Sequence, residues 1–210
     1  MPLHKIINHD SNSKILVWKI TETYEQLLGA VTLKEKSLLR LGGMKSELHQ
    51  RAFLSVRKLL QEIGYTDADL HYDAFGKPYF DNGTHISISH SHEFASIMVS
   101  DRNVGIDLEM QRDKIITIAH KFADVESVFL NPESEDYIKK LTVIWGAKEA
   151  IFKIRNEVGI SFKDHIKVRP FEVAQKQTTA MLNFENKAIE YDIFFEEIEN
   201  FTLVYAFAKA

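Results

Sequence analysis

The side chains best suited to chemistry are carboxylates that stand inside two separate, otherwise apolar segments. In the first segment Asp107 and Glu109 alternate with apolar residues, a period of two that is typical of a strand and turns both acids toward one side. In the second segment Glu149 and Lys153 are four positions apart, so on a helix they lie along one face. Because an unpaired charge in apolar surroundings costs free energy, these residues are candidates for function.

A helix packed against this strand would bring Asp107, Glu109 and Glu149 together, with Lys153 beside them. Three neighbouring carboxylates repel one another, and a divalent cation relieves that repulsion. A few hard oxygen ligands favour Mg²⁺, which keeps several of its waters and often holds a substrate phosphate as well. The sequence therefore predicts a magnesium site, with manganese as the alternative, and chemistry at phosphorus.

The elements that must position these residues fall into two comparable halves. In the first half the pattern predicts one helix, at 46–63, which ends before Gly64. It also predicts four strands, at 14–20, 70–72, 85–89 and 94–100. In the second half it predicts a strand at 104–109, a helical region at 115–130, a long helix from Asn131 to near Asn156, and strands at 166–173, 178–184, 189–195 and 202–208. This order predicts an α+β fold with a boundary near residues 101–103.

Composition favours a soluble enzyme over a disordered or membrane protein. With 45% hydrophobic residues among 210, the chain can bury a sizeable core. The net charge of −4 gives no overall attraction for nucleic acid, so an anionic ligand must meet a local basic cluster. The absence of cysteine excludes disulfides and thiol catalysis. No apolar run is long enough to span a bilayer and the first residues do not look like a signal peptide, so we expect a cytoplasmic location without membrane partners.

Four blocks of sequence resemble, in the same order, the 4'-phosphopantetheinyl transferase superfamily. They look most like its monomeric type, which activates surfactin synthetase and related peptide and polyketide synthetases. The blocks are the Phe-Gly-Lys-Pro-Tyr turn at 75–79, Ile-Ser-Ile-Ser-His-Ser at 86–91, the acidic strand at 104–109 and the helix segment at 145–153. With the helix around Arg51 and the segment 122–126, the resemblance extends from about residue 33 to about residue 163.

The resemblance implies a fold of two similar α/β subdomains related by a pseudo-twofold axis. The N-terminal subdomain, residues 1–102, would bind coenzyme A, and the C-terminal subdomain, residues 103–210, would carry the metal-binding and catalytic carboxylates. The implied reaction, of the holo-[acyl-carrier-protein] synthase type, transfers 4'-phosphopantetheine from coenzyme A to a serine of an apo acyl or peptidyl carrier protein. The products are the holo carrier protein and 3',5'-ADP, and the enzyme is expected to be a monomer.

The resemblance also implies roles for individual residues. Asp107, Glu109 and Glu149 match the metal ligands, and Glu149 matches the general base, which acts directly or through water. Lys153 matches the lysine that contacts the reacting phosphate and protonates the leaving group. The catalytic residues are thus expected to be Glu149, Lys153 and Asp107.

Several residues of the first half match contacts with coenzyme A. Arg51 matches the arginine that meets the 3'-phosphate, and His90, with Ser89 beside it, matches the histidine at a coenzyme phosphate. Lys77 lies in the turn that approaches the adenine and pantetheine portions, and Lys34 matches a further basic contact. Where the family often has another basic residue this chain has Ser37, and Lys36 or Arg40 could compensate for it. Which of Lys34, Lys36 and Arg40 contacts the 3'-phosphate is left open.

Simpler explanations compete with each of these assignments. Taken alone, Asp107 and Glu109 fit a solvated strand face, and Glu149 with Lys153 fits a surface ion pair on a helix. The apolar residues of 122–130 that resemble a carrier-protein docking surface, Phe122, Val125, Val128, Phe129 and Leu130, could equally form core. Two other functions stay open: a metal-dependent phosphodiesterase or nuclease, which the net charge disfavours, and a carrier-protein binding module without activity.

Overall fold

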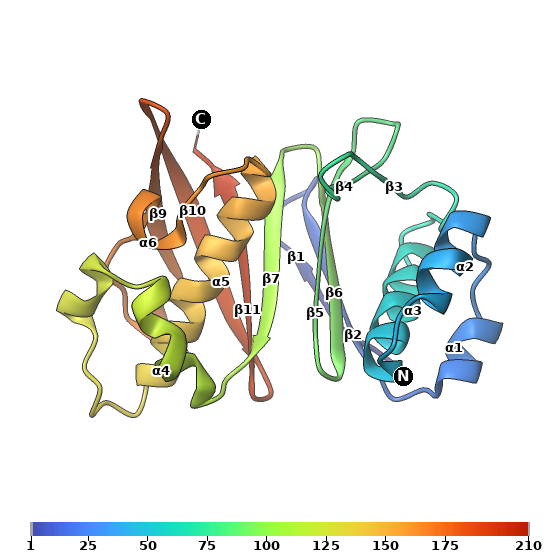
Figure 1. Ribbon diagram of the computed structural model, residues 1–210, viewed down its shortest axis with the longest axis horizontal. Helices are drawn as coiled ribbons and strands as arrows, with labels where there is room; N and C mark the ends of the chain where they lie inside the picture. Colours follow the sequence, from blue (N-terminus) through green and yellow to red (C-terminus); the bar gives the residue numbers. More distant parts are fainter. Residues whose placement is uncertain (1, 210) are drawn as a thin grey trace. The chain divides into compact units, whose positions relative to one another are not determined.

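The computed structural model describes residues 2–209 and divides the chain into two compact units, one up to Arg102 and one from Asn103 (Figure 1). Each unit combines an antiparallel sheet with helices, which confirms the predicted α+β class. Among the described residues no helix is long and apolar enough to cross a membrane. The pseudo-twofold relation between the units stays a prediction.

The N-terminal unit is built on a sheet of four strands in the order β1-β2-β6-β5. These strands are β1 (Leu3–Asn8), β2 (Lys14–Lys19), β5 (His85–Ser91) and β6 (Phe94–Ser100). Its helices are α1 (Tyr24–Gly29), α2 (Glu35–Gly42) and α3 (Glu47–Gln61), and a small hairpin pairs β3 (His71–Tyr72) with β4 (Pro78–Tyr79). The sequence pattern predicted β2, β3, β5, β6 and α3 but missed β1.

Helix α3 forms where the apolar period predicted it, because its apolar residues fall on one face. Leu54, Leu59 and Leu60 on that face are fully buried, and the helix packs against β2, β5 and β6 (Figure 1). Beyond its end the chain turns at Gly64, whose φ of +81° suits a residue without a Cβ. The helix therefore holds Arg51, in its second turn, close to the sheet.

The C-terminal unit contains a sheet of five strands in the order β7-β11-β10-β9-β8. The strands are β7 (Val104–Met110), β8 (Ile166–Val168), β9 (Gln177–Phe184), β10 (Lys187–Ile198) and β11 (Phe201–Ala208). The helical elements are α4 (Lys114–Ile118), α5 (Tyr137–Arg155), α6 (Phe162–His165) and three short 3₁₀ helices, η1 (Ala119–Lys121), η2 (Val125–Phe129) and η3 (Val173–Gln175). Helix α5 lies against β7 and β11 (Figure 1).

The long helix begins later than the sequence predicted. Asn131 and Pro132 form a turn instead, in which the side-chain oxygen of Asn131 accepts the N–H of Glu133 at 3.1 Å. The helix starts at Tyr137 and ends at Arg155, and the residue that caps it, Asn156, adopts a left-handed conformation with φ of 51°. Asparagine tolerates this conformation better than most residues, so the predicted end is confirmed and only the start was wrong.

Two other predicted elements are shorter than expected. The predicted strand 166–173 ends at Val168, two residues before Pro170, which has no backbone N–H to donate to the neighbouring strand β9. The helical region 115–130 divides into α4 and two 3₁₀ helices. Neither change affects β7 and α5, which carry the predicted acids.

Candidate active site

Glycines allow strand β7 and helix α5 to approach very closely. A Cβ on Gly105 of β7 would stand 1.9 Å from the carbonyl oxygen of Ala150 in α5, far inside van der Waals contact. A Cβ on Gly146 of α5 would stand 2.6 Å from Cγ2 of Val204, in β11, and 3.5 Å from Oδ2 of Asp107. Both positions exclude a side chain, so the strand and helix predicted to carry the acids do pack together at this point.

This close packing joins Asp107 and Lys153, which are distant in sequence. The Lys153 ammonium donates to Oδ1 of Asp107 at 2.9 Å and to the backbone carbonyl of Ile106 at 2.7 Å. The Asp107 side chain is 7% exposed and that of Lys153 28% exposed, so the ion pair lies between core and solvent. Neither the solvated strand face nor the surface ion pair on a helix describes this arrangement.

Glu149 lies on the same helix, one turn before Lys153, and is only partly exposed. Burial, which is the largest cause, and the negative charges of Asp107 and Glu109 together raise the pKa of Glu149 to about 7, although the positive charge of Lys153 opposes them. The four predicted residues therefore act on one another electrostatically. A carboxyl group with this pKa holds its proton about half of the time at neutral pH and can exchange it readily.

The donor set of this site suits a hard divalent cation by its chemistry. Asp107, Glu109 and Glu149 offer only oxygen ligands, and the effect of the two strand acids on Glu149 shows that their charges repel. Within residues 2–209, however, no three His, Cys, Asp or Glu side chains are gathered so as to hold a metal ion. The metal role of these three acids stays a prediction.

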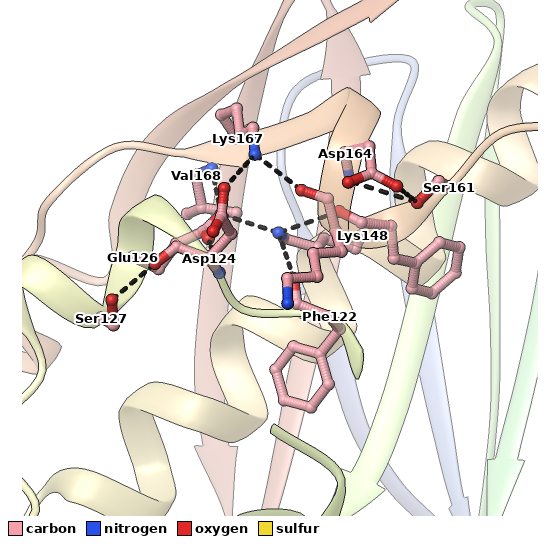
Figure 2. Close-up of polar contacts among 11 residues, drawn as sticks. Phe122, Asp124, Glu126, Ser127, Lys148, Ser161, Asp164, Lys167 and Val168 are labelled. Atoms are coloured by element: carbon pink, nitrogen blue, oxygen red, sulfur yellow. Dashed lines mark hydrogen bonds and ion pairs between the residues drawn. The ribbon is translucent and has the colours of Figure 1, made fainter. Parts of the chain in front are cut away.

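A buried ion pair next to Glu149 was not predicted from the sequence. Lys148 and Glu126 are both 0% exposed, and the ammonium lies 2.7 Å from Oε1 of Glu126 (Figure 2). The same ammonium donates to the carbonyl oxygens of Phe122 at 2.6 Å and Phe162 at 3.0 Å. Burial lowers the pKa of Lys148, and the charge of Glu126 offsets part of that effect. A lysine inside the apolar part of the helix motif was the signal that could have revealed it.

Glu126 extends this connection to strand β8 and to the loop before η2. Its Oε1 also accepts the backbone N–H of Val168 at 2.9 Å, and its Oε2 accepts that of Asp124 at 3.0 Å. Lys167 closes over the cluster from β8, with its ammonium 3.0 Å from Asp124 (Figure 2). The pair thus fixes segment 122–126 to helix α5 at Lys148, the residue before Glu149 in the sequence.

The segment predicted to dock a carrier protein is partly core and partly surface. Phe122 is fully buried, and Phe129 and Leu130 are half-buried against the core of this unit. Val125 is 48% and Val128 90% exposed, both on η2. The apolar surface available for a partner on this segment is therefore smaller than the sequence suggested.

In the N-terminal unit, Arg51 holds the position on α3 that the sequence predicted. Its Nη2 donates to the carbonyl oxygen of Ile20 at 3.2 Å. Its Nε is buried and makes no hydrogen bond within the described residues. One edge of the guanidinium is thus anchored to the chain.

Lys34 has a structural role that the sequence did not show. Its ammonium donates to the carbonyl oxygen of Leu70, and its backbone N–H donates to Oδ2 of Asp67 at 3.0 Å. Ser37, buried in the next turn, donates to Oδ1 of Asp67 at 3.0 Å, and Arg57 donates to the same oxygen at 2.8 Å. Burial would raise the pKa of Asp67, but these partners outweigh it and lower the pKa.

The two basic alternatives on α2 differ from Lys34. Lys36 and Arg40 are exposed, and the Arg40 guanidinium lies over the Tyr72 ring at 5.1 Å from its centroid. Ser37 is bound to Asp67 and faces the interior. Lys36 and Arg40 are thus the more accessible cations of this segment.

The remaining predicted contacts lie on the hairpin turn and on β5. Lys77 is half-buried and donates its backbone N–H to Oδ1 of Asp73 at 2.8 Å. Ser89 is buried, whereas His90 is exposed with its ring centroid 6.2 Å from that of His49 on α3. Among these residues His90 has the most accessible side chain.

Comparisons with known proteins show the family to which the chain belongs. A sequence model of the 4'-phosphopantetheinyl transferase superfamily matches residues 103–207, half of the chain. The chain is 27% identical over 150 residues to the 4'-phosphopantetheinyl transferase gsp of Aneurinibacillus migulanus, a match that covers 69% of this chain. It spans 61% of that relative's length. The resemblance stated from the sequence is confirmed, and the chain belongs to the 4'-phosphopantetheinyl transferase superfamily.

Proposed function

We propose that this protein transfers 4'-phosphopantetheine from coenzyme A to a serine of an apo acyl or peptidyl carrier protein. The observation that carries the proposal is the cluster of Asp107, Glu149 and Lys153, which the glycine contact between β7 and α5 brings together. Family membership and the name of the relative support the same reaction.

The transfer begins with removal of a proton from the carrier serine. Glu149, whose pKa is about 7, is suited to accept this proton directly or through a water molecule. The serine oxygen then forms a bond to the phosphorus that bears pantetheine, and the bond from that phosphorus to the bridging oxygen of the diphosphate breaks. The leaving group is 3',5'-ADP, and the carrier protein gains the phosphopantetheine.

Lys153 and a cation held by the acids would compensate the negative charge of the diphosphate. We propose that the Lys153 ammonium contacts the reacting phosphate and gives a proton to the leaving oxygen. Asp107, Glu109 and Glu149 would hold Mg²⁺, or Mn²⁺ in its place, and the bound cation would neutralise diphosphate charge.

We assign coenzyme A contacts to the N-terminal unit. Arg51 can offer a planar guanidinium to the 3'-phosphate, and His90 and Lys77 can donate to the remaining phosphate and pantetheine oxygens. We also propose Ser89, next to His90, as a contact. Because its side chain is buried, it would reach coenzyme A through its backbone or touch only the edge of the ligand. Because Lys34 is bound to Leu70, Lys36 or Arg40 is the better source of the further basic contact.

The carrier protein is proposed to meet the C-terminal unit on the exposed side of η2, at Val125 and Val128. We further propose that the protein is of the surfactin-synthetase-activating type, acts as a monomer and works in the cytoplasm.

Mass spectrometry of an apo carrier protein incubated with coenzyme A, Mg²⁺ and this protein tests the proposal. The expected result is a mass gain of one phosphopantetheine, together with release of 3',5'-ADP. A carrier protein whose acceptor serine is replaced by alanine is the control and should gain nothing. Binding of the carrier without a mass gain would instead indicate a module without activity, and cleavage of nucleic acid in a parallel assay would indicate a nuclease.

A further inference from the structure

Lys153 is bound to one of the carboxylates that we propose as cation ligands. Its ammonium donates to Oδ1 of Asp107 at 2.9 Å and is fixed in place by the carbonyl oxygen of Ile106 at 2.7 Å. A divalent cation that took Oδ1 of Asp107 as a ligand would lie close to the ammonium, and the two positive charges would repel each other. Binding of the cation at this oxygen therefore weakens the ion pair between Asp107 and Lys153.

The charges around Lys153 explain why it lies there. Asp107 is buried, Glu149 is one helical turn away, and both carboxylates gain from a nearby positive charge. Lys153 is the residue of α5 that supplies it, and its side chain is 28% exposed, so it can rotate out on its flexible stem without disturbing the core.

We propose that Lys153 is a built-in counter-ion that a divalent cation displaces from Asp107. The inference rests on the proposed function, because it takes Asp107, Glu109 and Glu149 as the cation ligands. Displacement has two consequences. It lowers the affinity for the cation when no coenzyme is present, and it releases the ammonium for a phosphate oxygen when coenzyme A is bound.

Cation binding by the protein alone, without coenzyme A, tests this inference. Mn²⁺ titrated into the wild type and Lys153→Met at pH 8.5, followed by electron paramagnetic resonance, gives the two dissociation constants. Since a hydrogen bond to a charged group is lost on displacement, we expect K153M to bind Mn²⁺ about tenfold more tightly, which equals about 1.4 kcal/mol.

Lys139 provides a matched control on the same helix. It forms an ion pair of the same type with Glu197 at 2.8 Å, and its side chain is 39% exposed. Lys139→Met makes the same change in net charge as K153M but at a different place. We therefore expect K139M to change the Mn²⁺ affinity less than twofold, which separates local competition from general attraction.

Thermal unfolding supplies a second measurement. Without divalent cations K153M should unfold at a lower temperature than the wild type, since it leaves Asp107 and Glu149 uncompensated. Saturating Mg²⁺ should raise the unfolding temperature of K153M more than that of the wild type. Equal shifts in both proteins, or Mn²⁺ binding by K153M that is unchanged or weaker, would overturn the displacement.

The failure of this inference is distinguishable from failure of the proposed function. If the wild type modifies the carrier protein but K153M and K139M bind Mn²⁺ like the wild type, only the counter-ion role is wrong. If K153M does not fold, Lys153→Gln, which keeps much of the stem and removes the charge, replaces it with the same expected gain. An Asp107→Asn, K153M double variant should lose that gain, and its retention would also overturn the proposal.

Discussion

Replacing Lys148 with methionine tests whether the buried pair with Glu126 holds helix α5 to the rest of its unit. The substitution keeps most of the side-chain volume but removes a charge that is 0% exposed and paired at 2.7 Å. Removing one partner of a buried pair costs about 3–5 kcal/mol, since the other charge is left uncompensated. Lys148 also donates to two backbone carbonyls, while the methionine recovers part of the packing energy. We therefore expect a loss of about 4 kcal/mol in the free energy of unfolding.

Urea denaturation followed by tryptophan fluorescence measures this loss in the C-terminal unit alone. The chain has 2 tryptophans, and Trp18→Phe leaves only Trp145 as the reporter. The Trp145 ring lies 5.2 Å from that of Phe122, whose carbonyl is one of the Lys148 partners. The reporter therefore senses the region that the substitution disturbs.

Two further variants test whether the loss of stability in K148M comes from the unpaired charge of Glu126. Lys139→Met, which breaks an exposed ion pair, should cost less than about 1 kcal/mol. Adding Glu126→Gln to K148M removes the uncompensated charge, so the double variant should be more stable than K148M by at least about 1 kcal/mol. If K148M lies within about 1 kcal/mol of the wild type, or the double variant is the less stable of the two, the reasoning about this pair is refuted.

Glu149→Gln should lower the rate of carrier modification by a factor of about 10² to 10⁴ and leave the circular dichroism spectrum of the folded protein unchanged. A variant that is as active as the wild type, or one that is unfolded, would contradict this. The wild-type rate should rise with pH through about 7 as Glu149 loses its proton, and a rate that is flat between pH 5.5 and 8.5 would oppose its role as base. The pKa of Glu149 is about 7 in the folded state and 4.5 in the unfolded state, so between pH 4.5 and about 7 the folded state binds more protons than the unfolded state does. Stability should therefore fall as pH rises from 4.5 to about 7, by at most about 3 kcal/mol, and E149Q should lack this dependence. Gly105→Ala should destabilise the C-terminal unit by more than about 2 kcal/mol and reduce activity, because its Cβ would stand 1.9 Å from a backbone oxygen; unchanged urea midpoint and activity would speak against the close contact. Arg51→Ala should raise the KM for coenzyme A roughly tenfold but that for dephospho-coenzyme A much less, and equal losses with both would place Arg51 away from the 3'-phosphate.

The elements with strong periodicity could be predicted from the sequence. Strand β7 and helix α3 have apolar residues at the period of their own structure, so local pattern and tertiary packing agree. The start of α5 was misplaced because Asn131-Pro132 suits both a helix start and a turn, and here it forms the turn. Such a choice depends on packing that the local sequence does not encode.

The buried charges could not be predicted, because each depends on a partner that is distant in the chain. Arg57 pairs with Asp67, and Lys148 with Glu126, both at side-chain exposures of 3% or less. In a sequence such lysines and arginines look like the exposed face of a helix. Lys34 was assigned to the coenzyme by resemblance, and only the structure shows its bond to the carbonyl of Leu70.

Two lysines of helix α5 have different electrostatic roles, because they pair with different acids. Lys148 is 0% exposed and bound to Glu126 and two carbonyls, so moving it would leave several buried groups without partners. Lys153 is 28% exposed and its partner Asp107 is itself a proposed ligand, so its place can be taken by another cation. The first lysine is thus suited to hold Glu149 in position, and the second to exchange with a cation or a phosphate during turnover. Because the contact of Gly105 with α5 leaves the helix little freedom to shift, this exchange is expected to involve the Lys153 side chain alone.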